Sequence, residues 1–288
     1  MSLVTLFIHK RITWEHDFIC NDLLRNIPFQ THYFDDLFVP FKAEVEDKGP
    51  SILAIDCRTT NAIPIATELQ PRVILFMSDE TGSRSQMAVE LAKHCSILFK
   101  QYHHRTTDDE HIFQLALGYC SGFLDGECKS QSEENQYICS FVGTEKSDRR
   151  EMIDTFRSFE SSRFEITSNN WQIAQQVIPP SMCRDIYNKS MFVLQGRGYV
   201  SLDCFRIYEA LAAGSVPIIV GTKEEMAATF YFNGKMPPFL FCSTWEEAKA
   251  KVEYYMANKN AYDELKKQCV NWWNQHISFV NQMIQNCL

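Results

Sequence analysis

The most constraining feature of the sequence is a strand–loop–helix–strand pattern in residues 191–220. A short apolar run is interrupted by Gly196-Arg197-Gly198 and is followed by residues with helical spacing. Asp203 is predicted to be the N-cap of that helix, and Gly214 is predicted to end it. The apolar, β-branched residues that follow indicate the next strand. A β-α-β unit of this length belongs to a parallel sheet, so we predict an α/β fold.

The glycine loop and the start of the predicted helix form a candidate anion site, because free backbone N–H groups and the helix dipole point there. Arg206 and Glu209 lie one turn apart on the same helix face. Such a pair suits a diphosphate and a ribose hydroxyl, or alternatively a surface ion pair worth about 0.3 kcal/mol. Its place after the glycine loop favours ligand binding. A second strand–glycine–helix pattern occurs at Gly143-Thr144, with Arg149 and Arg150 near the helix start.

The first half of the chain also alternates apolar strands with helical segments, which favours a second parallel sheet. Ligands of such sheets bind beyond the carboxyl ends of the strands. Asp56, Asp79 and Glu80 follow predicted strands, and His103-His104 follow another. A carboxylate at this edge can accept a proton from an attacking hydroxyl, given hydrogen-bond reach. The equally supported alternative for Asp79 is a cap of the helix that begins near Ser83.

Length and charge narrow the range of functions. The 288 residues allow two domains of ordinary size. The net charge of −8 argues against a nucleic-acid partner, which needs a basic surface. The eleven cysteines include no Cys-x-x-Cys pair, which favours a reducing compartment over a disulfide framework or a zinc site. We expect no signal peptide and no membrane span, because no apolar window is long enough.

Several nucleotide-dependent classes of protein lack their motifs here. A dinucleotide-binding loop needs a third glycine where Ser201 stands, so nicotinamide chemistry is not expected. The phosphate-binding loop of kinases and the Gly-x-Ser-x-Gly turn of hydrolases are absent from the sequence. The polar residues at 103–111 match no common metal-ligand spacing. The sequence contains no Asp-x-Asp triplet, which favours neutralisation of a diphosphate by arginines and helix dipoles.

A set of motifs in a fixed order resembles the exostosin-like glycosyltransferases, in particular the branch of ribitol xylosyltransferase and small viral xylosyltransferases. The resemblance covers residues 73–220. Its most specific part is the block Arg206-x-x-Glu209-Ala210 followed by Gly214-Ser215-Val216-Pro217. The other motifs are Asp79-Glu80, Phe99–His104, Leu115–Tyr119, Phe141–Thr144 with Arg149, and Gln195–Gly198.

The resemblance implies a GT-B architecture, with two Rossmann-like domains facing a cleft and a C-terminal helix that crosses back to the N-terminal domain. The expected domains are residues 1–130 on the acceptor side, residues 137–265 for the nucleotide sugar, and the helix 266–288. It also implies inverting transfer without a metal. The co-substrate is expected to be a nucleotide sugar, UDP-xylose above all, with a glycan hydroxyl as acceptor and no other cofactor.

Carried over residue by residue, the resemblance divides the candidate site into three groups. The catalytic group comprises Asp79 as the base, Glu80 beside it, and Arg206 for the leaving diphosphate. The donor-binding group comprises Gly143, Thr144, Arg149, Arg150, Gln195, Gly196, Arg197, Gly198, Tyr199, Ser201 and Glu209. The acceptor-side group comprises His16, His103, His104 and Tyr119. No residue is assigned to a metal.

Two alternatives stay open from the sequence. The donor could belong to another class, such as GDP-fucose, because base and sugar selectivity depend on contacts that spacing does not reveal. The fold could also serve a sugar-nucleotide or glycan-binding protein without catalysis.

Animal members of the family usually carry a membrane anchor, which this sequence lacks. The sequence is therefore either a trimmed part of a longer protein or a cytosolic member of the family. The cysteine usage favours the latter, so we expect a cytoplasmic protein, such as a viral protein in a host cytoplasm, that acts as a monomer or weak dimer.

Overall fold

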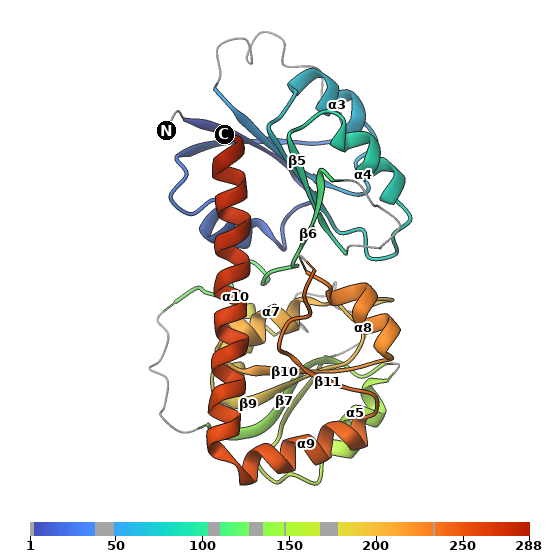
Figure 1. The fold of residues 1–288 in the computed structure, drawn as a ribbon, viewed down its shortest axis with the longest axis vertical. Coiled ribbons are helices and arrows are strands. Elements are labelled where there is room, and N and C mark those ends of the chain that lie inside the picture. The colour runs from blue at the N-terminus through green and yellow to red at the C-terminus, as the bar shows by residue number, and fades with distance from the viewer. Residues whose placement is uncertain are drawn as a thin grey trace. The chain divides into compact units, whose positions relative to one another are not determined.

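The computed structural model describes residues 3–37, 49–102, 110–126, 135–146, 148–167, 178–232 and 234–288. The chain forms two compact units (Figure 1). The first unit consists of Met1–Leu117 together with His276–Leu288, and the second is Gly118–Gln275. Each unit contains one parallel β-sheet with helices packed on it, which confirms the predicted α/β class with two such units.

The positions at which the chain divides differ from the boundaries predicted at residues 130 and 266. The first unit ends at Leu117, before the predicted boundary at residue 130. The last helix, α10 (Lys259–Cys287), begins within the second unit and joins the first unit only from His276 onward.

The first sheet has six parallel strands, and its interior strands are buried runs of apolar residues. Because both faces of such strands are covered, their sequences show no alternation of polar and apolar residues. The strand order is β2-β1-β3-β4-β5-β6. The bounds are β1 (Val4–His9), β2 (Phe29–Phe34), β3 (Ser51–Asp56), β4 (Val73–Met77), β5 (Ile97–Gln101) and β6 (Ile112–Leu115).

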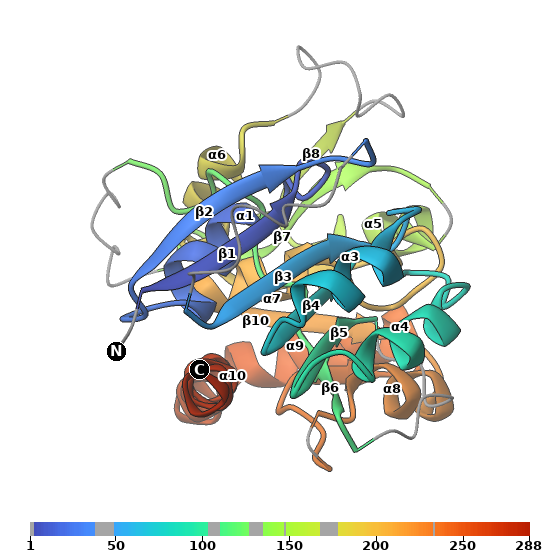
Figure 2. The same ribbon diagram turned by 90° about the horizontal axis from the view of Figure 1, so that it is seen from above.

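Two helices of the first unit, α3 (Ala62–Leu69) and α4 (Ser85–Ala92), lie side by side on one face of this sheet (Figure 2). Their small and branched side chains, such as Ala66 and Leu91, belong to the same core cluster as Leu53 and Phe76 of the strands. Pro64 is tolerated because it lies in the first turn of α3, where a missing N–H breaks no helical hydrogen bond.

The segment that follows the loop after β1 forms a helix that changes its geometry along its length. It starts as α1 (His16–Phe18) and continues as a π-helix, η1 (Ile19–Leu23). The N–H of Leu24 donates to the carbonyl of Ile19 at 3.0 Å, which is the wider π spacing. The Asn281 side chain of α10 donates to the carbonyl of Leu23 at 2.8 Å and so ties the end of α10 to η1.

The second sheet has five parallel strands in the order β11-β10-β9-β7-β8. The strands are β7 (Tyr137–Thr144), β8 (Arg163–Thr167), β9 (Ser190–Gln195), β10 (Val216–Val220) and β11 (Leu240–Cys242). The helices of this unit, besides the start of α10, are α5 (Arg149–Phe156), α6 (Pro180–Tyr187), α7 (Phe205–Ala212), α8 (Lys223–Phe230) and α9 (Trp245–Ala257).

The two ends of α7 bear out one sequence prediction and correct another. Gly214 has a φ of +76°, and the N–H of Ser215 donates to the carbonyl of Ala210 at 2.8 Å, as in a Schellman motif. The predicted N-cap, Asp203, is wrong, because Cys204 occupies that position in an extended conformation without a side-chain cap. Asp203 lies in the turn before the helix, where its N–H donates to Ser201 Oγ at 3.0 Å.

The strand order of each sheet reverses once, and that point fixes where a ligand site is expected. The reversal lies between β1 and β3 in the first sheet and between β7 and β9 in the second. Crossover connections leave on opposite faces at such a point, which opens a crevice at the carboxyl ends of the two strands. The residues there are His9 and Asp56 in the first unit, and Thr144 and Gln195 in the second.

Candidate functional site

A cluster of arginines and one aromatic ring occupies the reversal point of the second sheet. Phe141, near the end of β7, lies under the guanidinium groups of Arg149 and Arg206, whose central carbons are 5.7 and 5.3 Å from the ring centroid. Planar guanidinium groups stack on aromatic faces because the charge is attracted to the ring quadrupole. Phe141 therefore holds two positive groups, one from α5 and one from α7, in one place.

Arg149 is positioned by backbone carbonyls on both sides of the reversal point. One terminal nitrogen donates to the carbonyl of Thr144 at 3.0 Å, and the other donates to the carbonyl of Arg197. The side chain passes directly over Gly196, where an added Cβ would overlap the Arg149 Cγ. Position 196 is a glycine because the arginine needs that space.

Replacing Gly196 with alanine should therefore destabilise the protein by about 1–3 kcal/mol through overpacking. The free energy of unfolding, measured by urea denaturation, checks this. In an Arg149→Ala background the same substitution should cost less than half as much, because the clashing side chain is gone. Equal costs in the two backgrounds would show that the close approach of Arg149 is not what requires the glycine.

Arg206 lies in the first turn of α7 and is half-buried. Its Nη2 donates to the carbonyl of Gly196 at 3.2 Å, while its buried Nε–H has no acceptor among the residues that the structure describes. The buried Gln195 side chain also has a donor without an acceptor, because no group in the described part of the chain accepts a hydrogen bond from its Nε2. An unmade hydrogen bond at a buried donor costs about 1–3 kcal/mol. Two such donors at one strand edge suit a ligand rich in acceptor oxygens.

Glu209 shares a helix face with Arg206 as predicted, but its carboxylate turns elsewhere. Its Oε1 accepts the N–H of Cys120 at 3.3 Å, and in the described structure no ion pair joins it to Arg206. Burial raises the pKa of the Glu209 carboxyl, while the Cys120 N–H and Arg206 oppose that rise. Binding of a ribose hydroxyl by Glu209 stays a prediction.

The remaining predicted donor residues divide between this cluster and its rim. Arg197 donates its N–H to the Asp148 carboxylate at 3.2 Å, and its guanidinium pairs with Glu225 at 2.8 Å. Arg150 is exposed and pairs with a neighbouring carboxylate. The loop beyond β9 is closed by the N–H of Gly198 donating to the carbonyl of Ser201 at 2.9 Å, and the side chain of Tyr199 is 79% exposed.

The predicted base, Asp79, is 1% exposed and has its carboxylate oxygens engaged. The ammonium of Lys100, itself fully buried, lies 3.0 Å from Asp79 Oδ2. The N–H of Arg84, at the N-cap of α4, donates to Asp79 Oδ1 at 3.2 Å. Lys100 also donates to the carbonyl of Tyr102 at 2.9 Å. The contact with the Arg84 N–H agrees with the alternative that the sequence left open, in which Asp79 serves the start of the next helix. The neighbouring Glu80 is half-buried.

The predicted acceptor-side residues do not form one cluster. His16 Nε2 lies 2.9 Å from the Tyr33 hydroxyl, at an exposed position of the first unit. Tyr119 belongs instead to the second unit, where its buried ring packs against Phe123 at a centroid distance of 6.0 Å. Its acceptor-side role stays a prediction. His103 and His104 lie outside the described residues.

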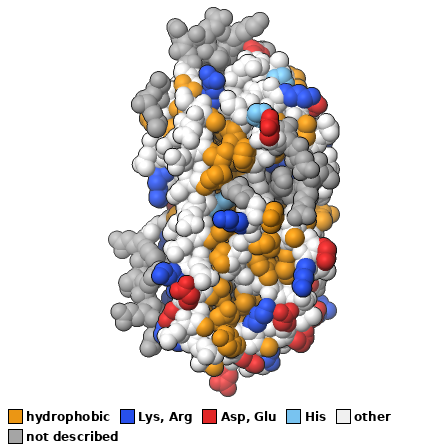
Figure 3. Space-filling model, viewed as in Figure 1, with side chains coloured by type: hydrophobic (Ala, Val, Ile, Leu, Met, Phe, Trp, Pro, Cys, Tyr) orange, Lys and Arg blue, Asp and Glu red, His pale blue; other side chains and the backbone are white. Residues whose placement is uncertain are grey.

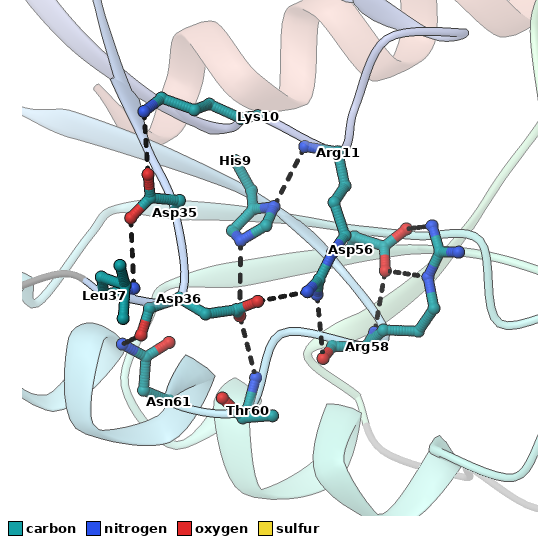
Figure 4. Close-up of polar contacts among 10 residues, drawn as sticks. All are labelled: His9, Lys10, Arg11, Asp35, Asp36, Leu37, Asp56, Arg58, Thr60 and Asn61. Carbon is teal, nitrogen blue, oxygen red and sulfur yellow. Dashed lines mark hydrogen bonds and ion pairs between the residues drawn. The ribbon is translucent and has the colours of Figure 1, made fainter.

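Sequence reasoning missed a polar cluster at the reversal point of the first sheet (Figure 4). His9 ends β1 and is buried, and its Nδ1 accepts the N–H of Arg11 at 3.1 Å. Its Nε2 then faces Asp36 Oδ1 at 3.5 Å, and Asp36 also pairs with the Arg11 guanidinium. Burial lowers the pKa of His9. Through the Arg11 N–H and the Asp36 carboxylate, His9 links the loops that follow β1 and β2.

Beside this cluster lie two buried carboxylates, Asp56 and Glu15, which differ in the groups that bind them. Asp56 binds Arg58 in a bidentate pair, with N–O distances of 2.7 and 2.8 Å. Glu15 is 4% exposed, and its carboxyl accepts a hydrogen bond from the Ser78 hydroxyl at 3.3 Å. Burial raises the pKa of Glu15 to about 7. The sequence shows a glutamate in the loop after the first strand, but it does not show that this side chain is buried.

Three further observations complete the description of the site. Among the described residues, no group of three or more His, Cys, Asp or Glu side chains is placed to hold a metal ion. No described helix is both long and apolar enough to cross a bilayer. On the face drawn in Figure 3, acidic and basic side chains of the described residues are interspersed, and those residues form no continuous basic area there.

Comparison with known proteins gives matches at the level of family and of fold. The family model described as the RXYLT1 C-terminal domain matches residues 123–288, which is more than half of the chain. Ribitol-5-phosphate xylosyltransferase 1 of Homo sapiens is 26% identical over 175 residues, covering 54% of this chain and 39% of the relative. The Mus musculus protein of the same name is 25% identical over 198 residues, covering 62% and 44%. The matched part is less than half the length of either relative.

Among solved structures, Anabaena Alr3699/HepE in complex with UDP and glucose is similar, with a TM-score of 0.57 over 99% of both chains at 9% identity. A second structure of that protein, with UDP, gives a TM-score of 0.55. Identity this low shows a shared fold alone. The sequence matches confirm the predicted resemblance to the xylosyltransferase branch, and they extend beyond the predicted span of residues 73–220 to the end of the chain.

Proposed function

Because the chain belongs to the RXYLT1 C-terminal domain family, we propose that it is a glycosyltransferase that moves xylose from UDP-xylose to a hydroxyl of a glycan or polyol. The observation that carries this proposal is the arginine cluster on Phe141, with two buried N–H donors that lack acceptors in the described structure. The sugar and the acceptor class follow those of the xylosyltransferase relatives. The choice of UDP is supported by the Anabaena protein of the same fold, which binds UDP.

In this proposal the second unit binds the donor at the carboxyl ends of β7 and β9. The glycines at 143 and 196 leave room for the side chains of Phe141, Arg206 and Arg149, which hold the two guanidinium groups at this edge. Arg206 and Arg149 face the charge that develops as the sugar–phosphate bond breaks. Preorganised donors of this kind stabilise a leaving group strongly, because they need no reorientation during the reaction. Inversion and independence of a metal are part of the proposal, as expected for charge neutralisation by arginines.

One observation favours the alternative of a binding protein without catalysis. Asp79, the expected base, has its carboxylate occupied by Lys100 and by the N–H of Arg84. A transferase of this mechanism needs a different group to accept the proton of the acceptor hydroxyl. If the first unit offered none, sugar-nucleotide binding alone would be the better description.

Isothermal titration calorimetry with UDP, GDP and CMP tests the donor site. We expect UDP to bind at least tenfold more tightly than GDP or CMP. Transfer from UDP-xylose, UDP-glucose and GDP-fucose to ribitol 5-phosphate, followed by mass spectrometry, then tests the reaction. Product from UDP-xylose alone supports the proposal. Tight GDP binding together with transfer of fucose would show that the donor is GDP-fucose. Nucleotide binding with no turnover of any donor would favour a binding protein without catalysis.

A further inference from the structure

The buried carboxylates of the first unit, among the residues that the structure describes, are those of Asp22, Asp56, Asp79 and Glu15. Three of them have a cation at ion-pair distance. Asp22 lies 3.4 Å from Arg25, Asp56 lies 2.7 Å from Arg58, and Asp79 lies 3.0 Å from Lys100. In the described structure Glu15 has no such partner. An ion-paired carboxylate is a poor proton acceptor, because the neighbouring cation stabilises its charged form.

Glu15 also lies where the strand order of the first sheet reverses. It ends the loop that follows β1, and the residue that binds it, Ser78, directly follows β4. The carboxyl ends of parallel strands at a reversal point form the expected ligand crevice. Trp14, which precedes Glu15, is 43% exposed, and Tyr33 on β2 is 54% exposed.

The residue that holds Glu15 is in a strained conformation. Ser78 has a φ of +68°, in the left-handed region that non-glycine residues rarely adopt. It is fixed there because its N–H donates to Gln101 Oε1 at 3.0 Å and its carbonyl accepts from Cys57 Sγ at 3.3 Å. Strain of this kind persists only when the surroundings enforce it, and it gathers at functional sites. Here it directs the Ser78 hydroxyl at Glu15 Oε1.

We propose that Glu15 is the general base of the transfer reaction, and that Ser78 is its positioning residue. This inference rests on the proposed transferase function and names the group that Asp79 leaves missing. The Glu15 carboxylate accepts the proton of the acceptor hydroxyl as the hydroxyl oxygen forms a bond to the anomeric carbon. The bond from that carbon to the β-phosphate oxygen breaks, and its electron pair leaves on the diphosphate. The products are the glycoside, the nucleoside diphosphate and a protonated Glu15.

The protonation state of Glu15 suits this role near neutral pH. Its pKa is raised to about 7, chiefly by burial and to a smaller extent by Asp56, while its own backbone N–H, the Ser78 hydroxyl and Arg58 oppose the rise. A base works best when its pKa lies near the working pH, because it is then both deprotonated and basic enough. The reactive form is the carboxylate, so kcat/KM should rise with pH and level off above the pKa.

The test compares Glu15→Gln and Glu15→Asp with the wild type and with Glu90→Gln, an exposed α4 carboxylate paired with Lys93. Glu15→Gln should lower kcat by about 10²–10⁴-fold. Its UDP affinity by calorimetry should stay within threefold of the wild type. Glu15→Asp should keep part of the activity, and Glu90→Gln should match the wild type. In the wild type, kcat/KM should show an inflection near pH 7 that Glu15→Gln lacks.

The outcomes separate the two proposals. If the Glu15→Gln variant keeps a transfer rate within threefold of the wild type, Glu15 is not the general base. The proposed transferase function is then unaffected. A wild type that turns over no sugar nucleotide overturns the transferase and the base together. Loss of activity in Glu15→Gln with the inflection near pH 7 retained in the residual rate overturns the base, because it assigns that titration to another group. Circular dichroism spectra that match the wild type, with the UDP affinity, exclude misfolding as the cause of a loss.

Discussion

Replacing Lys100 with methionine should lower the free energy of unfolding by about 3–5 kcal/mol, the largest stability effect expected in the first unit. Lys100 is fully buried and lies 3.0 Å from the buried Asp79 carboxylate. Methionine keeps the length and apolar stem of the side chain but leaves the Asp79 charge without a counter-ion. It also removes the donor that now binds the Gln101 and Tyr102 carbonyls. Urea denaturation followed by circular dichroism measures the loss.

A matched control lies on α4 of the same unit. Lys93 and Glu90 form a shorter ion pair, of 2.7 Å, but both side chains are exposed. Lys93→Met should therefore change stability by about 0.5 kcal/mol or less. Adding Asp79→Asn to Lys100→Met should restore part of the loss, because position 79 then carries no unpaired charge and the amide oxygen can still accept the Arg84 N–H. A Lys100→Met loss no larger than that of Lys93→Met would contradict a buried ion pair.

Replacing Arg206 with alanine should lower kcat/KM for transfer by about 10²–10³-fold, the loss typical of removing one preorganised donor to a developing anion. The guanidinium stacks on Phe141 and binds the Gly196 carbonyl, and its Nε–H has no acceptor in the described structure. It is therefore held in place before a ligand arrives. Steady-state kinetics with varied donor, together with UDP calorimetry, separates a loss of binding from a loss of turnover.

Two further variants make the Arg206 result specific. Arg206→Lys keeps the charge but loses the planar group that stacks and donates from several nitrogens, so it should recover only a small part of the rate. Arg157→Ala removes an exposed arginine of the same unit, paired with Asp154 at 3.8 Å, and should leave the rate unchanged. Full activity of a folded Arg206→Ala protein would show that the leaving charge is neutralised elsewhere.

The donor half of the site could be predicted because its determinants are local in sequence. The strand before Gly196, the helix that carries Arg206, and Gly214 at its end all lie within residues 191–220. Strand ends follow from apolar runs, and a glycine after a helix indicates a left-handed turn. The Phe141 ring that joins Arg149 to Arg206 was not predictable, because it depends on which strands are neighbours.

The acceptor half of the site was harder to predict from the sequence, because its residues come together only in the tertiary fold. Asp79 follows a buried strand and has the position expected of a base, but Lys100 on the next strand occupies it. Glu15 has no distinguishing neighbour in sequence, and its raised pKa arises chiefly from burial, with a smaller contribution from Asp56. Residue type and spacing indicate which groups reach a strand edge. They do not indicate which of these groups is already neutralised.

The assembly of the first unit from Met1–Leu117 and His276–Leu288 has a consequence for biosynthesis. The ribosome must translate the whole of the second unit before it releases the segment that carries Val280 and Ile284, both fully buried. At about 5–20 residues per second, this interval lasts roughly 10–30 s. During that time the nascent sheet exposes an apolar strip that suits a holdase chaperone. Translation speed therefore sets when the first unit can close, however fast its sheet folds.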